Sequence, residues 1–420
     1  MKMQAAPLFG LLATLYLAQG LPAGLTAHAL PTLLREQDVA LSLVTLSNLL
    51  ALPWLFKFLW APFLDQRRYR LAWLLGIQAL AFAVFLLLAL FSLPEWLSQQ
   101  AQGFIILLIS VNFLMSCHDV LTDGSAVRLL SDRQKGVGNT FQVAGYKVGM
   151  IIGGSGLLYG VGALGWSSAV IWISALGLML WLVTVLLSRP FYIAMNAASP
   201  AQTPAKGSNS GMWQSWRGFF AQPNMLWWVA IVLTFKLGDS LVSGLVRPYW
   251  VDQGLTLAWI GQVGAIGVLA SLLGALLGGL LYRAWGNYRS LVLAGSAQAL
   301  CLLGYGFGAV GLNAEEHETL LALVFLLEQV ADGASTVVLF AAMMKACRIE
   351  YAGVDYTLQA CLFLWLTGVL KVISGKLAQT LGYPMIFVIS ASLFLLTLWL
   401  LVKWKQRGEF LPPTTQEHSS

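Results

Sequence analysis

The chain has 420 residues, of which 58% are hydrophobic and only 10% are charged. Soluble globular domains carry about 25% charged residues, so this composition excludes an aqueous fold of this size. Apolar runs of about 20 residues, the length that crosses a bilayer core, recur along the whole chain and predict a multi-pass membrane protein. The four cysteines show no metal-binding spacing, and we predict neither a disulfide nor a metal site.

Twelve apolar segments separated by charged or turn-rich breaks are predicted to cross the membrane. We expect each to be a helix, because a single span in lipid must satisfy its own backbone hydrogen bonds. Their approximate limits are 7–34, 40–62, 71–93, 103–129, 138–161, 166–188, 223–247, 258–282, 290–312, 319–345, 355–379 and 383–403.

The distribution of charge predicts the orientation of these segments. Most lysines and arginines fall in the breaks on one side, whereas the opposite side holds acids such as Glu36, Asp38 and Asp252. The positive-inside rule therefore places both termini in the cytoplasm. The net charge of +6 follows from this asymmetry and gives no reason to expect a nucleic-acid partner.

The longest break contains SPAQTPAKGSNSG, a composition typical of flexible linkers. It predicts an N-terminal six-helix half over 1–188 and a linker over 189–222. We also predict a C-terminal six-helix half over 223–403 and a cytoplasmic tail over 404–420.

The two halves repeat one another. Asp119-x-x-x-Asp123-Gly124 matches Glu328-x-x-x-Asp332-Gly333 at an offset of 209 residues, and the break DQRRYR has a counterpart in YRAWGNYR. Parallel six-helix repeats are the architecture of many secondary transporters, which bind their solute between the repeats. We therefore predict an all-α membrane protein with two parallel six-helix repeats.

The repeated acids are candidates for proton coupling or for ion pairs between helices. Residues four apart share a helix face, and a charge at the bilayer centre costs about 2.5–3.5 kcal/mol, so these side chains should point inward. One alternative is that they form structural ion pairs. The other is that one acid of each pair carries a proton, because neighbouring carboxylates repel one another. The residues are Asp119, Asp123, Glu328 and Asp332.

Further polar and aromatic residues in the middle of predicted spans are candidates for a substrate cavity. Their aromatic rings suit a bulky amphipathic or aromatic solute, and their cationic groups favour an anionic or metal-chelate solute. They are Gln19, Tyr146, Lys147, Lys236, Asp239, Trp365 and Lys371. Lys57 lies near the cytoplasmic end of its span, and we predict that its side chain extends to the membrane surface.

Charged residues at the cytoplasmic breaks are candidates for a gate. They can join helix ends in one conformation of a transport cycle, although they can also serve only to orient the chain in the membrane. They are Asp65, Arg67, Arg70, Arg283 and Arg289. Glycines spaced four apart, such as Gly149 and Gly153, predict close packing of helices.

Three segments carry a resemblance to a known family: LYLAQGLPAGLTAHALPTLLRE, PWLFKFLWAPFLDQRR and HDVLTDGSAVRLL. They resemble the branch of the major facilitator superfamily that contains muropeptide permeases and acetyl-CoA transporters. Within that branch, EYAGVDYTLQ is most similar to the permeases for the siderophores rhizobactin and pyochelin.

The resemblance implies the major facilitator fold and a monomeric, proton-coupled permease of the bacterial inner membrane that moves its solute inward. We expect a siderophore or ferric siderophore as the solute, with a muropeptide or another large anionic conjugate as the alternative. Muropeptide permeases of this branch usually have additional C-terminal spans, which favours the first. No HExxH, GxSxG or P-loop motif supports an enzyme or a sensor, and no cofactor is expected.

Overall fold

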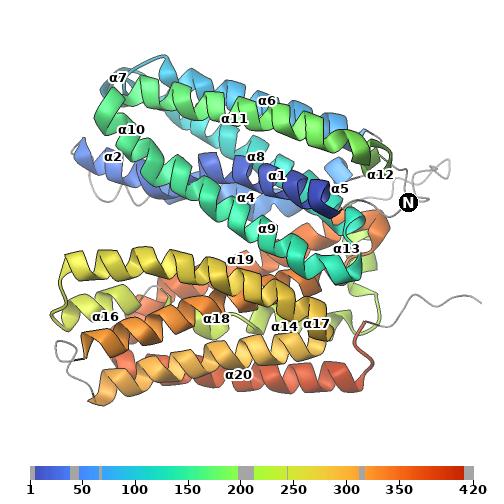
Figure 1. Cartoon of the computed structure of the whole chain (residues 1–420), viewed down its shortest axis with the longest axis vertical. Coiled ribbons are helices and arrows are strands. Elements are labelled where there is room, and N and C mark those ends of the chain that lie inside the picture. Colours follow the sequence, from blue (N-terminus) through green and yellow to red (C-terminus); the bar gives the residue numbers. More distant parts are fainter. Residues whose placement is uncertain are drawn as a thin grey trace, which may run out of the picture. The chain divides into compact units, whose positions relative to one another are not determined.

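The computed structural model describes residues 5–37, 47–65, 69–196, 212–243, 245–311 and 317–410. Within these ranges every regular element is a helix (Figure 1). Ten helical segments of the described residues are long and apolar enough to cross a membrane. The all-α membrane fold predicted from composition is therefore confirmed.

One of those segments contains two of the predicted spans. Helix α17, Leu257–Gly311, reverses at Gly286, whose φ of 70° and ψ of −167° are not helical. A positive φ is accessible to glycine at little cost, so Gly286 ends one arm and begins the next. The predicted segment 40–62 is described only from residue 47, where a short apolar helix covers Leu49–Leu59.

Contacts within the chain define two compact units. Unit 1 consists of Met1–Ser131, Gly138–Met212 and Cys347–Cys361, and unit 2 consists of Asp132–Val137, Trp213–Ala346 and Leu362–Ser420. Three of the boundaries between the units fall inside helices, namely α9 (Asp132–Ile151), α13 (Met212–Phe220) and α19 (Ala352–Leu381).

Unit 1 is a bundle in which α1 packs on α8 and α11, and α6 packs on α8 and α11. Its apolar core includes Leu21, Phe82, Phe85 and Met115, all buried. The elements are α1 (Ala5–Gly24), η1 (Leu25–Ala29), α2 (Leu30–Glu36), η2 (Ser47–Ala51), α4 (Leu52–Phe56), η3 (Lys57–Leu59), α5 (Ala61–Asp65), α6 (Arg70–Leu86), η4 (Leu87–Ala89), α7 (Leu93–Gln99), α8 (Ala101–Leu129), α9 (Asp132–Ile151), η5 (Ile152–Gly156), α10 (Leu157–Leu164), α11 (Trp166–Ser188), η6 (Arg189–Phe191) and α12 (Tyr192–Asn196).

The glycines of α9 and η5 allow α1 to approach closely. A Cβ atom on Gly149 would lie 2.8 Å from the Cα of Gly20, and one on Gly153 would lie 2.6 Å from the carbonyl carbon of Leu21. No side chain fits at such distances, so the predicted glycine packing is confirmed. Both η1 and η5 are single π-helical turns at this contact.

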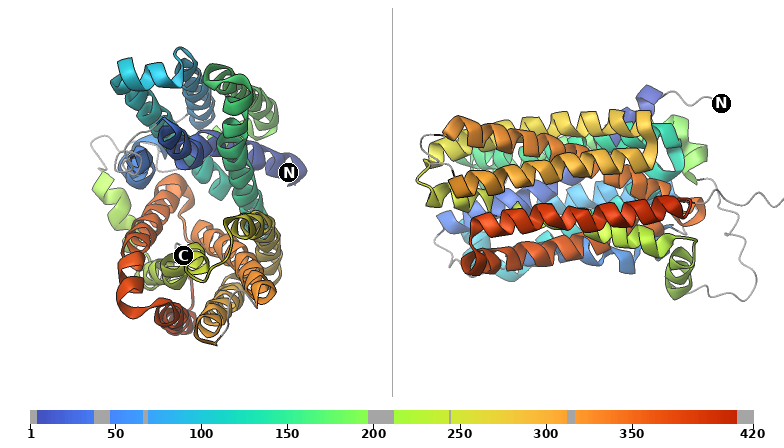
Figure 2. Two further views of the ribbon diagram at one scale, coloured as in Figure 1. Left: turned by 90° about the vertical axis from the view of Figure 1, so that its left-hand side faces the viewer. Right: turned by 90° about the horizontal axis from the view of Figure 1, so that it is seen from below.

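Unit 2 is a second helical bundle, in which α17 packs on α18 and α20, and α20 also contacts α14 and α15. The left view of Figure 2 shows its helices nearly end on. Its core includes Trp250, Tyr305, Phe325 and Phe387. The elements are α13 (Met212–Phe220), α14 (Met225–Thr234), α15 (Leu237–Val242), α16 (Val246–Asp252), α17, α18 (Glu318–Lys345), η8 (Ile349–Tyr351), α19 (Ala352–Leu381) and α20 (Tyr383–Gln406), of which η8 and the start of α19 belong to unit 1.

Candidate functional site

The second predicted span is divided into short helical pieces, and a lysine side chain at the point of division lies inside unit 1. Proline is tolerated in the first turn of a helix, and Pro53 and Pro62 lie in the first turns of α4 and α5. The 3₁₀ turn η3 lies between these short helices and begins at Lys57. The Lys57 side chain is only 5% exposed, so the prediction that it reaches the membrane surface is wrong.

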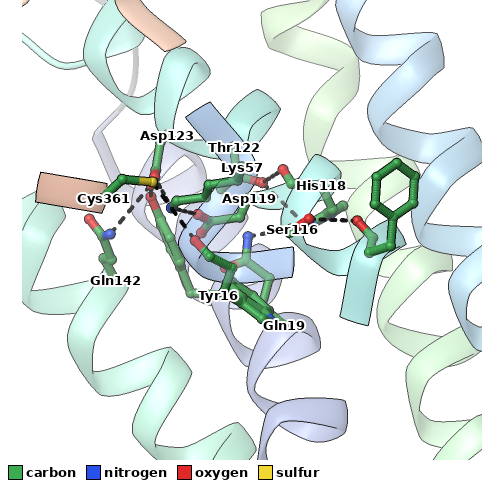
Figure 3. Close-up of polar contacts among 12 residues, drawn as sticks. Tyr16, Gln19, Lys57, Ser116, His118, Asp119, Thr122, Asp123, Gln142 and Cys361 are labelled. Atoms are coloured by element: carbon green, nitrogen blue, oxygen red, sulfur yellow. Dashed lines mark hydrogen bonds and ion pairs between the residues drawn. The ribbon is translucent and has the colours of Figure 1, made fainter. Parts of the chain in front are cut away.

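Lys57 binds the acid pair of α8 (Figure 3). Its ammonium forms a hydrogen-bonded ion pair with Asp119 Oδ2 and lies 3.9 Å from Asp123 Oδ2. Both carboxylates are buried, with side-chain exposures of 9% and 2%. Asp119 and Asp123 thus share one face of α8, as their spacing predicts.

Asp123 has two further polar neighbours. The Tyr16 hydroxyl donates a 2.6 Å hydrogen bond to its Oδ1, and Gln142 Nε2 donates a weaker one at 3.4 Å. These side chains come from α1 and α9, so Asp123 links three helices of unit 1. Sequence reasoning missed Tyr16 because a tyrosine in an apolar span gives no signal of its partner.

Gln19 and His118 form a polar contact next to the acids. Gln19 Nε2 lies 3.1 Å from His118 Nδ1, and the Thr122 hydroxyl donates to the His118 carbonyl at 2.9 Å. Both Gln19 and His118 are buried. The predicted cavity residue Gln19 therefore lies in the polar interior of unit 1.

The charges of the unit 1 cluster do not balance when both acids are ionised. One ammonium, Lys57, is placed against two carboxylates in a buried environment. An uncompensated buried charge costs several kcal/mol, and a proton on one carboxylate removes that cost. The geometry distinguishes the two acids, because Asp119 contacts the ammonium directly whereas Asp123 binds Tyr16.

The matching acids of α18 belong to a second cluster, in unit 2. Lys236 lies in the turn between α14 and α15, and its Nζ is 2.7 Å from Asp332 Oδ1 and 3.9 Å from Asp239 Oδ2. It also donates to Gln298 Oε1 at 3.0 Å. Glu328 is buried and accepts a 2.9 Å hydrogen bond from Gln329. The cation of this cluster comes from the first span of its repeat, whereas Lys57 comes from the second.

The remaining predicted cavity residues differ in exposure. Tyr146 packs edge-on against Trp54 with ring centroids 6.5 Å apart, and Lys147 is partly exposed. Trp365 and Lys371 are exposed on α19. A common cavity for all of these residues stays a prediction.

The predicted gate residue Asp65 joins three segments of unit 1. Its carboxylate pairs with Arg128 at the end of α8 and accepts hydrogen bonds from the backbone N–H groups of Gly353 and Val354, at 3.1 and 3.4 Å. Arg70 Nε donates to the Asp65 carbonyl at 2.8 Å. Sequence reasoning missed Arg128 and the start of α19. Arg283 and Arg289 are exposed, and Arg67 lies outside the described residues.

A second ion pair fixes the start of α19. Arg348 binds Asp355 through Nε and Nη2, at 2.8 and 2.6 Å, and through its backbone N–H at 2.9 Å. Burial lowers the pKa of the Arg348 guanidinium, but the hydrogen bonds and charge of Asp355 outweigh it and raise that pKa above its ordinary value. The start of α19, which contacts Asp65, is therefore also fixed by the ion pair between Arg348 and Asp355.

We expect Arg128→Met to lower the free energy of unfolding by about 3 kcal/mol, because it leaves the buried Asp65 carboxylate without its closest cation. Thermal unfolding of the purified protein in detergent measures this change. Arg133→Met, which removes an exposed arginine of α9, is the matched control. Equal unfolding temperatures for the two variants would mean that Arg128 serves only to orient the chain.

A helical membrane protein with buried lysine–carboxylate clusters in its apolar helices has the features of a secondary transporter. Residues 12–360 match the family model of the Major Facilitator Superfamily, and the chain belongs to that superfamily. It is a multi-pass membrane transporter and not an enzyme.

Relatives of known name agree with the branch predicted from the motifs. The chain is 24% identical to the anhydromuropeptide permease of Escherichia coli K12, over 96% of this chain and 81% of the relative. It is 22% identical to the putative transporter AmpG 4 of Rickettsia conorii, over 92% of this chain and 94% of the relative. These relatives support the muropeptide branch and not the siderophore permeases in particular.

Solved structures support the fold alone. A bacterial homologue of the iron transporter ferroportin, in an outward-facing state, matches with a TM-score of 0.71 and 18% identity, over 96% of this chain and 99% of that one. The Escherichia coli fucose:proton symporter FucP matches with a TM-score of 0.68 and 14% identity, over 95% and 98%. The major facilitator fold is thus established.

Proposed function

We propose that the protein is a proton-coupled importer of anhydromuropeptides in the bacterial inner membrane, with both termini in the cytoplasm. The similarity to the Escherichia coli permease, which covers 96% of this chain, supports this solute class. An anhydromuropeptide is a conjugate of sugar and peptide that carries carboxylates. An anhydromuropeptide is therefore one of the large anionic conjugates that the family resemblance implies as the alternative to a siderophore.

The cluster of Lys57, Asp119 and Asp123 is the observation that supports proton coupling. Asp119 holds the Lys57 ammonium, and Asp123 takes up and releases the coupled proton while its carboxylate binds the Tyr16 hydroxyl. Loss of the proton from Asp123 leaves a buried charge next to Lys57. The resulting attraction over 3.9 Å favours a shift of the ammonium toward Asp123. Such a shift changes the contact between the Lys57 segment and α8, so that the protonation of Asp123 affects how α5 packs on α8.

The Asp65 contacts supply the conformational part of the cycle. Asp65 and Lys57 lie on the same short stretch, η3 to α5, and both bind α8. A change at Lys57 is therefore transmitted along eight residues of chain to the contact with the start of α19. We assign to this contact the closure of the cytoplasmic side, which the protonation state of Asp123 then influences.

Uptake into proteoliposomes tests the proposed function. With an acidic exterior, we expect the purified protein to accumulate a radiolabelled anhydromuropeptide, and a protonophore to abolish that accumulation. Ferric rhizobactin and ferric pyochelin, offered under the same gradient, test the solute class expected from EYAGVDYTLQ. Accumulation of a ferric siderophore with no uptake of the anhydromuropeptide would overturn the proposal in favour of siderophore import.

A further inference from the structure

Unit 2 contains a cavity whose charged residues belong to neither acid cluster. It has a volume of about 450 Å³ and lies between α16, the C-terminal third of α19 and the start of α20. Its polar lining consists of Asp252, Lys371, Ser374, Gln379 and Tyr383. Ligand pockets typically measure about 300–1,000 Å³, so this cavity can hold a group as large as one or two amino-acid residues.

The two charged groups of the cavity have opposite signs and are open to solvent. Asp252 and Lys371 are both exposed. Within the described residues, neither lies within ion-pair distance of an oppositely charged group, and the charge of Lys371 acts on Asp239 only from farther away. Both charges are therefore available to a ligand.

The structure holds Asp252 in a defined position. The Tyr383 hydroxyl donates a 2.7 Å hydrogen bond to Asp252 Oδ2. The Tyr383 ring packs against Tyr249 and Phe387, with centroids 5.3 and 6.3 Å apart. Ordering a side chain before a ligand arrives reduces the entropy lost on binding, so Asp252 is suited to recognition.

The wall beside Lys371 is open. A Cβ atom added to Gly375, one turn after Lys371, would meet no atom within 4 Å. The Ser374 hydroxyl donates to the Lys371 carbonyl at 2.9 Å and is therefore occupied within α19. A ligand group therefore has room to reach the ammonium along this face.

We propose that this cavity binds the zwitterionic amino-acid end of the transported conjugate, with Lys371 on its carboxylate and Asp252 on its ammonium. A purely anionic group would be repelled by Asp252 and a purely cationic group by Lys371, whereas a zwitterion satisfies both. This inference rests on the proposed function, because it assigns the peptide part of the conjugate to a particular site.

Exchange of solute across proteoliposome membranes tests the assignment without a pH gradient. The two probes are an anhydromuropeptide whose peptide carries a free ammonium and a free carboxylate on one residue, and the same conjugate acetylated at that ammonium. For the wild-type protein, we expect acetylation to raise the KM about tenfold, because a charged hydrogen bond is lost. The maximal rate should change little, since the contact is made in the bound ground state.

Variants of the two charged residues complete the test. Lys371→Met and Asp252→Asn should each raise the KM for the free conjugate about tenfold. Asp252→Asn should also remove the difference between the two conjugates. Lys376→Met, which removes an exposed lysine from the same helix without lining the cavity, should leave both KM values unchanged.

The outcomes separate this assignment from the proposed function. Uptake of both conjugates by the wild-type protein with equal KM values would overturn the cavity assignment and leave the proposed function standing. The same conclusion follows if Lys371→Met and Asp252→Asn behave like Lys376→Met. No exchange of either conjugate by the wild-type protein would overturn both.

Discussion

Asp123→Asn is expected to reduce accumulation of solute under a pH gradient by about 100-fold, while exchange of solute at equal pH continues. Asparagine has nearly the shape of aspartate and still accepts the hydrogen bond from Tyr16, but it cannot titrate. The variant therefore keeps the packing of unit 1 and loses the coupled proton. Uptake and exchange are measured in the same proteoliposomes, so differences in the amount of protein cancel.

Asp119→Asn is the matched comparison, because it alters the other acid of the same helix face. It should lower the unfolding temperature more than Asp123→Asn does, since Asp119 is the direct partner of Lys57. Tyr16→Phe removes the hydrogen bond to Asp123 and should shift the external pH that gives half-maximal uptake. Normal accumulation under a pH gradient by Asp123→Asn would contradict its assignment as the proton carrier.

Lys57→Met is expected to lower the free energy of unfolding by about 3–5 kcal/mol, because two buried carboxylates lose their cation. The methionine side chain fills a similar volume, so the effect is electrostatic and not a cavity. Thermal unfolding in detergent measures the loss. A proton on each acid relieves the repulsion, and the difference from the wild-type protein should therefore decrease as the pH is lowered.

The double variant Lys57→Met/Asp119→Asn identifies the interaction responsible. Removing one acid together with the lysine leaves a single buried carboxylate, so part of the lost stability should return. Lys376→Met controls for the loss of a positive charge elsewhere on the protein. If the double variant is less stable than Lys57→Met by the full effect of Asp119→Asn, the two residues do not interact.

Sequence alone predicted the fold and the burial of Asp119, Asp123 and Glu328. Composition and span length lead to a helical membrane protein, and the cost of a charge in lipid leads to inward-facing Asp119 and Asp123. These arguments depend on the type of residue and on its depth in the membrane. Both properties are local to one helix and can be read from the order of residues.

The partners of Asp119, Asp123 and Asp65 could not be predicted from the sequence. Lys57 lies four residues after Pro53, near the end of a predicted span. Its depth in the membrane alone favours a side chain that extends to the membrane surface. The direction that the side chain takes depends instead on the 3₁₀ turn η3. The partners of Asp65 include the backbone N–H groups of Gly353 and Val354. Every residue except proline carries such a group, so no sequence pattern marks the donors.

The different origins of Lys57 and Lys236 bear on the history of the chain. The acids occupy equivalent places in the two repeats, whereas the lysines lie on the second span of one repeat and the first span of the other. A duplication of an ancestral six-helix gene copies every residue to an equivalent place. If the two halves arose in this way, the ancestor carried acids at these places, and each lysine was either gained in one copy or lost from the other after the copies diverged.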